Sequence, residues 1–152
     1  MSTERNKERV REWFEVFNTG HFSGVAALHA EECRNHAPAP FDTTLWPSDG
    51  RPFGVEEFRG TVEWIRRSQP DLHVEIERML AEGDEVIAWI RASGTATGAA
   101  GPIPPTGASI EFAQAHRFRF VNDRIVEHWA VRDDLRSMIQ ARVITARAGR
   151  PQ

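Results

Sequence analysis

The sequence predicts an α+β domain in which helices pack on one face of a curved antiparallel sheet and enclose one pocket. Its first half places apolar residues at helical spacing, whereas its second half alternates apolar and polar residues as strands do. Its 152 residues suffice for one domain with a hydrophobic core, and no linker or internal repeat divides them. We therefore expect a single domain over residues 1–152, with an ordered core of about residues 4–146.

About three helices are predicted in the first half of the chain. The first runs from Glu4 to Asn18 and ends at a glycine, with a buried stripe formed by Val10, Trp13, Phe14 and Phe17. A second, short helix follows Ser23. Residues 33–37 look extended and lead into a Pro-rich loop over residues 38–52. The third helix runs from about Gly54 to Ser68, with a stripe formed by Val55, Phe58, Val62 and Ile65.

The second half predicts a meander of antiparallel strands followed by a short helix. The expected strands cover residues 72–77, 86–93, 110–120 and 124–132, with a turn at residues 82–84 and a Gly/Pro loop over residues 94–108. Asp133 or Asp134 caps the last helix. So few strands cannot close a barrel, and the predicted shape is a cone that is open at one end.

The strand from Ile110 to Phe120 carries polar groups on an apolar face. Read in steps of two, one face consists of Ile110, Phe112, Gln114, His116, Phe118 and Phe120. A buried amide or imidazole costs about 1–3 kcal/mol when it has no hydrogen-bond partner. Gln114 and His116 therefore need protein partners or a ligand.

The next strand can pair with this one in two registers. A two-residue turn at Asn122 and Asp123 pairs Phe120 with Ile125 and turns Glu127 toward the phenylalanines. A three-residue turn with a bulge pairs Val121 with Ile125, which places Arg119 opposite Glu127 on the solvent side. We prefer the second register, whose inner face reads Val126, His128, Ala130 and Arg132.

In the preferred register Gln114, His116, His128 and Arg132 converge on one wall. Histidine has a pKa suited to proton transfer near neutral pH, and Arg132 can hold a carboxylate or stabilise an enolate oxygen. The alternative is structural: these groups satisfy one another, or Arg132 pairs with a neighbouring aspartate at the rim.

Several segments together resemble the SnoaL-like polyketide cyclases of the nuclear-transport-factor-2-like superfamily. The segments are residues 94–98, 103–107, 118–120 and 125–133, preceded by Asn18-Thr19-Gly20-His21-Phe22 and Asn35-His36. The resemblance covers roughly residues 8–140. It implies the cone-shaped fold and an intramolecular aldol cyclisation of a polyketide-like small molecule, as in antibiotic biosynthesis, without metal or organic cofactor.

The resemblance also implies roles for particular residues. Family cyclases use an aspartate directly after the His-Trp pair, but this chain has Ala130 there. His128 or His116 is then the best remaining base, with Arg132 and Gln114 as the oxygen stabilisers. The residues expected to contact the substrate are Asn35, His36, Trp46, Phe112, Phe118 and Ala130, with Trp46 as a candidate lid and His36 alternatively bonded to backbone.

The missing aspartate leaves two further functions open. One is an enzyme of the same fold with changed chemistry, such as a hydrolase, a dehydratase or a hydroxylation partner. The other is a non-catalytic protein that binds an apolar ligand. The chain has no tyrosine, which excludes a phenol donor and with it a ketosteroid-isomerase-like or scytalone-dehydratase-like site.

Composition and charge exclude several classes of partner. The net charge of -3 gives no basic field for nucleic acid, and no apolar run is long enough to span a membrane. The six histidines show no metal-ligand spacing, and His21, His29 and His73 are expected at the surface. The lone Cys33 and the charged N-terminus favour a cytoplasmic protein. Outward Trp129 and Val131 predict a homodimer through the convex sheet face.

Overall fold

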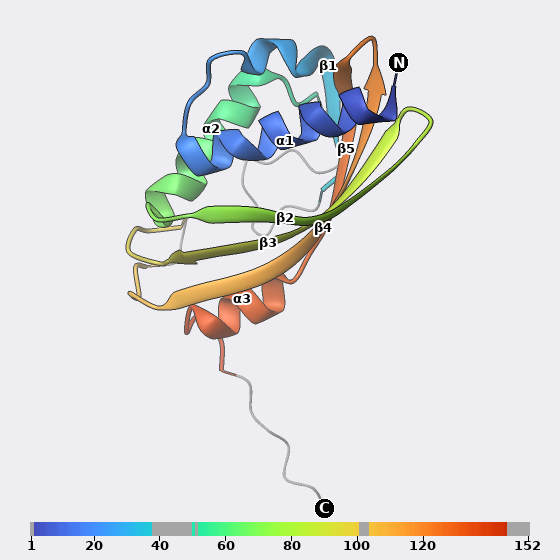
Figure 1. Cartoon of the computed structure of the whole chain (residues 1–152). Helices are drawn as coiled ribbons and strands as arrows, with labels where there is room; N and C mark the ends of the chain where they lie inside the picture. The colour runs from blue at the N-terminus through green and yellow to red at the C-terminus, as the bar shows by residue number, and fades with distance from the viewer. Residues whose placement is uncertain (1, 38–49, 51, 101–103, 146–152) are drawn as a thin grey trace, which may run out of the picture.

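The computed structural model describes residues 2–37, 50, 52–100 and 104–145 (Figure 1). Within these residues the chain forms α1 (Thr3–Thr19), a 3-10 turn η1 (Val25–Ala27), β1 (His29–Asn35), α2 (Val55–Ser68), β2 (His73–Glu82), β3 (Glu85–Thr95), β4 (Ser109–Val121), β5 (Arg124–Arg132) and α3 (Asp134–Gln140). The predicted α+β cone is confirmed, with two long helices over a curved, open sheet.

The sheet has the order β1-β5-β4-β3-β2. Strands β2 to β5 form the predicted antiparallel meander, whereas β1 pairs with β5 in parallel and makes the sheet mixed. The predicted second helix is only the single 3-10 turn, and the extended segment expected over residues 33–37 begins earlier, at His29. This earlier start carries β1 along β5, where its last residue, Asn35, lies beside His128.

Helix α1 crosses the sheet and supplies much of the apolar packing. Ser2 caps its start by accepting a hydrogen bond from the Arg5 N–H, and Gly20 ends it in the left-handed region at φ 69°. The predicted stripe is buried, with Trp13 and Phe14 at its centre. Just before the C-cap, the Asn18 amide bonds both backbone groups of Val74 and so completes the edge of β2.

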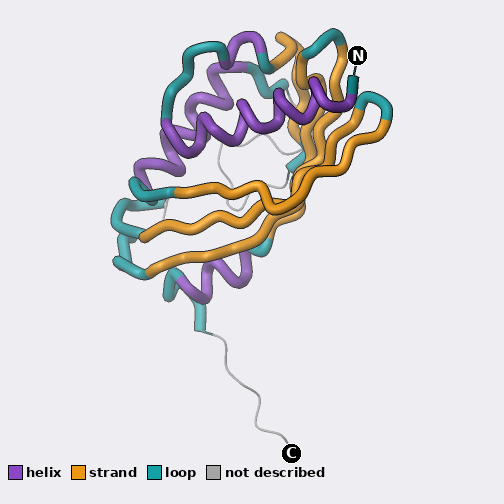
Figure 2. Tube along the Cα trace, viewed as in Figure 1, coloured by secondary structure: helices purple, strands orange, loops and turns teal. Residues whose placement is uncertain are grey.

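Helix α2 lies beside α1 on the same side of the sheet, as the purple coils above the orange strands show in Figure 2. Phe58 and Val62 of its predicted stripe are fully buried, and Val55 and Ile65 are partly buried against the core. The Phe58 ring packs on Trp13 and Phe17, with ring centroids 5.0 and 5.5 Å apart. The two helices and the concave sheet face therefore share one aromatic core.

The β4–β5 hairpin combines features of both predicted registers. Asn122 and Asp123 form a two-residue turn, both with positive φ, which pairs Phe120 with Ile125. The register then shifts so that Arg119 pairs with Glu127. The predicted pairing of Val121 with Ile125 is wrong, because the extra residue lies after the turn, at Val126, and not within it. Ile125 is buried in place of Val126, and the residues that follow keep their predicted faces.

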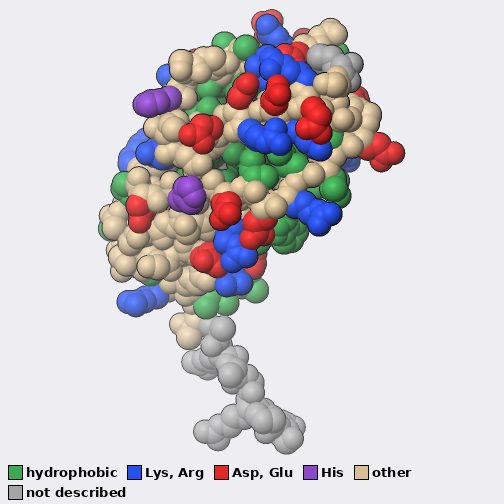
Figure 3. Space-filling model, in the orientation of Figure 1, with side chains coloured by type: hydrophobic (Ala, Val, Ile, Leu, Met, Phe, Trp, Pro, Cys, Tyr) green, Lys and Arg blue, Asp and Glu red, His purple; other side chains and the backbone are tan. Residues whose placement is uncertain are grey.

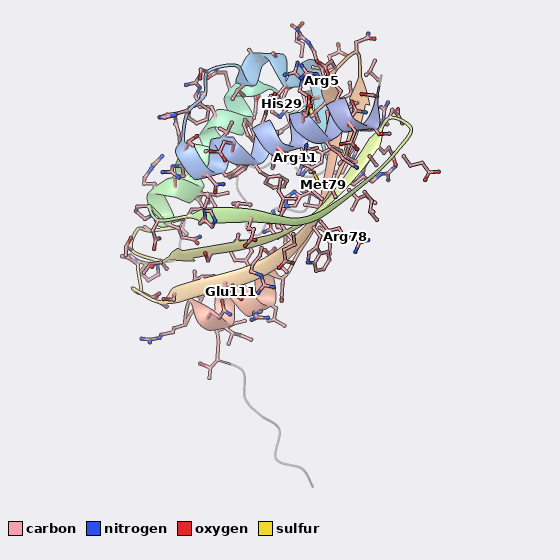
Figure 4. The ribbon with its side chains drawn as sticks, viewed as in Figure 1. Arg5, Arg11, His29, Arg78, Met79 and Glu111 are labelled. Atoms are coloured by element: carbon pink, nitrogen blue, oxygen red, sulfur yellow. The ribbon has the colours of Figure 1, made fainter. Side chains whose placement is uncertain are left out.

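Charged side chains of both signs cover the face of the molecule over α1 and β2 (Figure 3). Two of them tie α1 to the hairpin, since Arg5 and Arg9 both bond the Asp123 carboxylate in the β4–β5 turn. Between α1 and β2 the surface is hollowed, and Arg11, Arg78 and Met79 border this hollow (Figures 3 and 4). None of the helices that the structure describes combines the length and hydropathy that a bilayer crossing requires.

Candidate active site

A cavity of about 200 Å³ lies between the two long helices and the concave sheet face. Its wall is predominantly apolar, and the aromatic side chains that line it are Trp13, Phe14, Phe17, Phe53, Phe58, Trp64 and Phe112. Helix α3 contributes Ser137 and Met138 at one end, where Asp133 caps the helix by accepting a bond from the Arg136 N–H. The cavity can therefore hold a compact, largely apolar molecule.

One wall of this cavity is polar, and β4 and β5 build it. Gln114 pairs with Arg132 across the two strands, and His116 pairs with Ala130. All four of these residues line the cavity, together with His128 of β5 and Asn35 of β1. The predicted convergence of Gln114, His116, His128 and Arg132 on one wall is thus what the fold produces.

The two histidines of the wall belong to one chain of buried hydrogen bonds. His116 Nδ1 lies 2.9 Å from His128 Nε2, and His128 Nδ1 lies 3.0 Å from Asn35 Oδ1. Asn35 Oδ1 also accepts the Ala37 N–H at 3.0 Å. At the other end, His116 Nε2 lies 2.8 Å from the Gln114 amide oxygen. Both imidazoles are only 6% exposed, so water does not substitute for these partners.

This chain of bonds determines where the protons lie. Because Asn35 Oδ1 already accepts the Ala37 N–H, it faces His128 as an acceptor, and His128 carries its proton on Nδ1. In a neutral pair, His128 Nε2 then accepts from His116 Nδ1–H, which leaves the lone pair of His116 on Nε2, toward Gln114. The Gln114 amide oxygen can accept a hydrogen bond from His116 Nε2 only when the histidine pair carries one extra proton. In the neutral pair the Gln114 amide is flipped, so that its NH₂ group donates to Nε2.

Burial favours the neutral pair. It lowers the pKa of His116 to about 3, with a further contribution from the positive charge of Arg132. It also lowers the pKa of His128 well below the usual range, with the field of His116 as a second cause. Both effects disfavour the charged imidazolium. In the resting site His116 Nε2 is therefore unprotonated and lies in the cavity wall beside the Gln114 amide.

Arg132 places a positive charge in the same wall. Its side chain is 7% exposed, and its Nη2 lies 3.2 Å from Asp134 Oδ2 at the start of α3. Ala130 precedes it by two residues on the same strand face, and its small side chain lies opposite His116. The polar wall thus combines the imidazole of His116, the amide of Gln114 and the guanidinium of Arg132. Between them Ala130 contributes only its methyl group.

Two of the expected contact residues do not line the cavity. The ring of Phe118 is fully buried and packs against His116 and His128 from behind, at centroid distances of 6.1 and 5.0 Å. His36 is parallel to the Trp129 ring at 4.7 Å and bonds Glu127, so the expectation that it reaches the pocket is wrong. It follows Asn35 by one residue, and the alternation along β1 turns it to the other sheet face. Trp46 lies outside the described residues. Asn35, Phe112 and Ala130 do line the cavity.

Sequence reasoning missed a buried pair next to the site. His29, expected at the surface, is 2% exposed and lies beside α1, where it accepts a hydrogen bond from Trp13 Nε1 at 3.1 Å (Figure 4). Burial lowers its pKa to about 4. The Trp13 ring in turn packs on His128 at a centroid distance of 5.3 Å. Only the correct start of β1 would have placed His29 on the inner face.

The described part of the chain contains no cluster of three His, Cys, Asp or Glu side chains that could hold a metal ion. Cys33 is buried, and burial raises the pKa of its thiol to about 12, so it is a poor nucleophile. The groups of the polar wall are therefore the site's candidates for chemistry.

Known proteins resemble the chain in sequence and in fold. A model of the SnoaL-like polyketide cyclase family matches residues 7–141. No curated protein matches the sequence significantly. IdmH, a proposed polyketide cyclase from Streptomyces antibioticus, is 26% identical with a TM-score of 0.76, over 89% of this chain and 96% of that one.

Two further solved structures have the same fold. A proposed polyketide cyclase from Acidithiobacillus ferrooxidans is 25% identical, with a TM-score of 0.78 over 94% of this chain and 99% of that one. AclR, a proposed hydroxylase from Streptomyces galilaeus, has a TM-score of 0.78 over 97% of this chain and 87% of that one. Its 20% identity supports the shared fold alone.

Proposed function

This chain belongs to the SnoaL-like polyketide cyclase family, and we propose that it catalyses an aldol-type cyclisation of a polyketide-like, enolisable substrate with its own side chains as acid and base. The observation that carries the proposal is the hydrogen-bonded chain from Asn35 through His128 and His116 to Gln114, all four of which line the cavity. Aldol chemistry needs a base beside a carbon α to a carbonyl and a donor for the enolate oxygen. The polar wall offers both.

His116 is the base in this proposal. Its Nε2 takes the α-proton, and the resulting charge is shared through the Nδ1–H···Nε2 bond with His128. Both histidines have both ring nitrogens engaged, but His128 lies between His116 and Asn35, whereas the outer partner of His116 is Gln114, which itself lines the cavity. In this proposal the substrate therefore meets the pair at His116, and His128 acts through it. Of the two histidines that the sequence left open, the geometry favours His116. His128 and Asn35 are positioning residues that set its tautomer.

Gln114 and Arg132 stabilise the enolate. Once His116 Nε2 is protonated, the Gln114 oxygen accepts its proton, and the NH₂ group of the same amide is turned to donate to the enolate oxygen. The Arg132 guanidinium, opposite Gln114, favours that negative charge electrostatically. The enolate carbon then bonds to a second carbonyl carbon of the same molecule. The new alkoxide takes the proton back from His116 Nε2, so the ring forms without net loss of atoms.

Hydrogen exchange at the α-carbon tests the first step directly. A β-diketone or linear triketide ester is incubated with the enzyme in D₂O, and loss of the α-proton signal is followed by NMR. Because His116 Nε2 is the proposed base, His116→Gln should reduce enzyme-dependent exchange by about 10²- to 10⁴-fold. The matched control is His73→Gln, at an exposed histidine of β2, which should exchange at the wild-type rate.

The same experiment separates this proposal from its alternatives. Wild-type rates in His116→Gln would contradict the assignment of the base. If the wild type binds apolar ligands but catalyses neither exchange nor cyclisation, the chain is a non-catalytic binder. If it turns over the substrate without α-exchange, a changed chemistry such as dehydration or hydrolysis is the better account.

We also propose that the convex sheet face forms a homodimer with a second copy. Trp89, Ala115 and Val131 are neighbours across β3, β4 and β5, and Trp89 and Val131 are 48% and 76% exposed. Ile87 extends this apolar patch along β3. Light scattering should find a dimer at micromolar concentration and a monomer for Val131→Glu, whereas a monomeric wild type would contradict the proposal. We further propose a reducing, cytoplasmic setting, because the single cysteine, Cys33, leaves no internal disulfide.

A further inference from the structure

A surface hollow lies between α1 and β2, and we infer that it binds an amphipathic carboxylate, which is an acidic head group on a short apolar chain (Figure 3). Among the described residues that line it, only Phe14 and Val74 also line the cavity of the candidate active site. The hollow is therefore a separate place for a ligand. Its occupant is a second molecule, distinct from the cyclisation substrate, so this site does not depend on the proposed function.

A β-bulge in β2 shapes the apolar part of the hollow. The pairing of β2 with β3 shifts register between Ile76 and Arg78, and Ile76 and Met79 both pack against the core. These two inward side chains are three residues apart where regular alternation would make them two, so the bulge widens the space between them. Both line the hollow together with the buried ring of Phe14. A short apolar chain can therefore pack against the three of them.

Two arginines border this apolar part from opposite elements. Arg11 belongs to α1 and Arg78 to β2, and both side chains are exposed (Figure 4). Neither guanidinium makes a hydrogen bond or an ion pair with another residue of the described part of the chain. Their N–H donors therefore face solvent within the hollow and are available to a ligand.

Two other charged residues of the lining are already paired with residues outside it. The Lys7 ammonium lies 2.9 Å from Glu4 Oε1, and Arg91 Nη2 lies 2.7 Å from Glu77 Oε1. Lys7 and Glu77 line the hollow, whereas Glu4 and Arg91 do not. These four charges balance one another, so they do not neutralise the two arginines.

The charge that remains in the described lining is positive. Glu15 is the other carboxylate there, and it accepts a long hydrogen bond of 3.5 Å from the Asn18 amide without forming an ion pair to Arg11 or Arg78. Two guanidinium groups and one carboxylate leave an excess of one positive charge, which a monoanion balances. A ligand carboxylate meets this requirement, because its two oxygens match the fork of a guanidinium.

Two of the three methionines report on the two sites separately. Met79 lines the hollow and Met138 lines the cavity. In protein labelled with methyl-¹³C methionine, the two methyl signals are assigned with Met79→Leu and Met138→Leu and followed by NMR during titration. The probes are octanoate and octanamide, which have the same length and differ in charge. Octanoate should shift the Met79 signal to saturation with an affinity about 3- to 30-fold higher than octanamide, as expected for two exposed charge contacts.

Charge variants show whether the two arginines hold the ligand. Arg11→Gln combined with Arg78→Gln should lose the preference for octanoate at Met79. The matched control combines Arg124→Gln with Arg136→Gln, which removes two exposed arginines elsewhere and should keep the preference.

The wild-type titration alone can overturn the inference. Equal affinities of the two ligands at Met79, or no saturable shift of its signal with octanoate, would do so whether or not the double variant folds. A saturable shift of Met138 alone would place octanoate in the cavity and overturn it as well. A preference at Met79 that survives in the folded Arg11 and Arg78 double variant would also contradict it.

Discussion

Replacing His29 with glutamine should make the stability of the protein less sensitive to acid. His29 is 2% exposed, and burial lowers its pKa to about 4, whereas a histidine in the unfolded chain has a pKa of about 6.5. Between these values the unfolded chain binds a proton that the folded protein excludes. The stability that neutral His29 provides is therefore complete above about pH 6.5 and is lost as the pH falls toward 4.

The expected size of this effect follows from the two pKa values. Each pH unit between them removes about 1.4 kcal/mol of unfolding free energy, so His29 alone accounts for a loss of about 3 kcal/mol. The glutamine amide of the variant can still accept the Trp13 Nε1–H, but the ring contact that His29 makes with Phe58 at 4.8 Å is lost. We expect the variant to be less stable at pH 7 and its stability to approach that of the wild type near pH 4.5.

Urea unfolding followed by tryptophan fluorescence at pH 7, 6, 5.5 and 5 measures both effects. His21→Gln, at an exposed histidine, controls for the loss of an imidazole as such. Identical pH dependence of the unfolding free energy in wild type and His29→Gln would refute the reasoning, because His29 would then titrate alike in both states. His116 and His128 should add to the acid sensitivity that the variant retains.

Two further predictions concern the frame of the cavity. Phe58→Ala, which empties a fully buried site between α1 and α2, should cost about 3–5 kcal/mol in urea unfolding, and a cost below about 1 kcal/mol would contradict the core described above. Gly98→Ala should cost about 1–3 kcal/mol, because an added Cβ would lie 2.0 Å from the Arg67 carbonyl oxygen. The matched control is Gly60→Ala, because an added Cβ at Gly60 in α2 meets no neighbouring atom, and it should stabilise the folded protein by about 0.5–1 kcal/mol. Equal changes in unfolding free energy at both glycines would contradict the close packing of Gly98 against α2.

The hairpin was the most predictable part of the site. Alternation along β4 places Gln114 and His116 on the inner face, and the cross-strand pairing of Arg119 with Glu127 fixes which face of β5 turns inward. The local pattern could not tell where β5 carries its one extra residue. A two-residue turn followed by a bulge at Val126 and a three-residue turn both place the residues from Glu127 onward on the same faces of β5.

The β1 edge was the least predictable part. Residues 29–35 contain little alternation, and the strand exists because it pairs in parallel with β5, a contact between distant segments that no local pattern announces. His29 and His36 were misplaced for this reason. The same pairing brings Asn35 to His128, so the partner that sets the histidine tautomers became evident only in three dimensions.

The measurement that tests the central claim most directly is the protonation state of His116, by long-range ¹H–¹⁵N correlation NMR of histidine-labelled protein, with His116→Gln and His128→Gln used for assignment. At pH 7 both His116 and His128 should carry their proton on Nδ1, with Nε2 unprotonated, and neither should titrate near pH 6.5. A proton on His116 Nε2 at pH 7, or a His116 pKa between 6 and 7, would contradict the account of a neutral base facing the cavity.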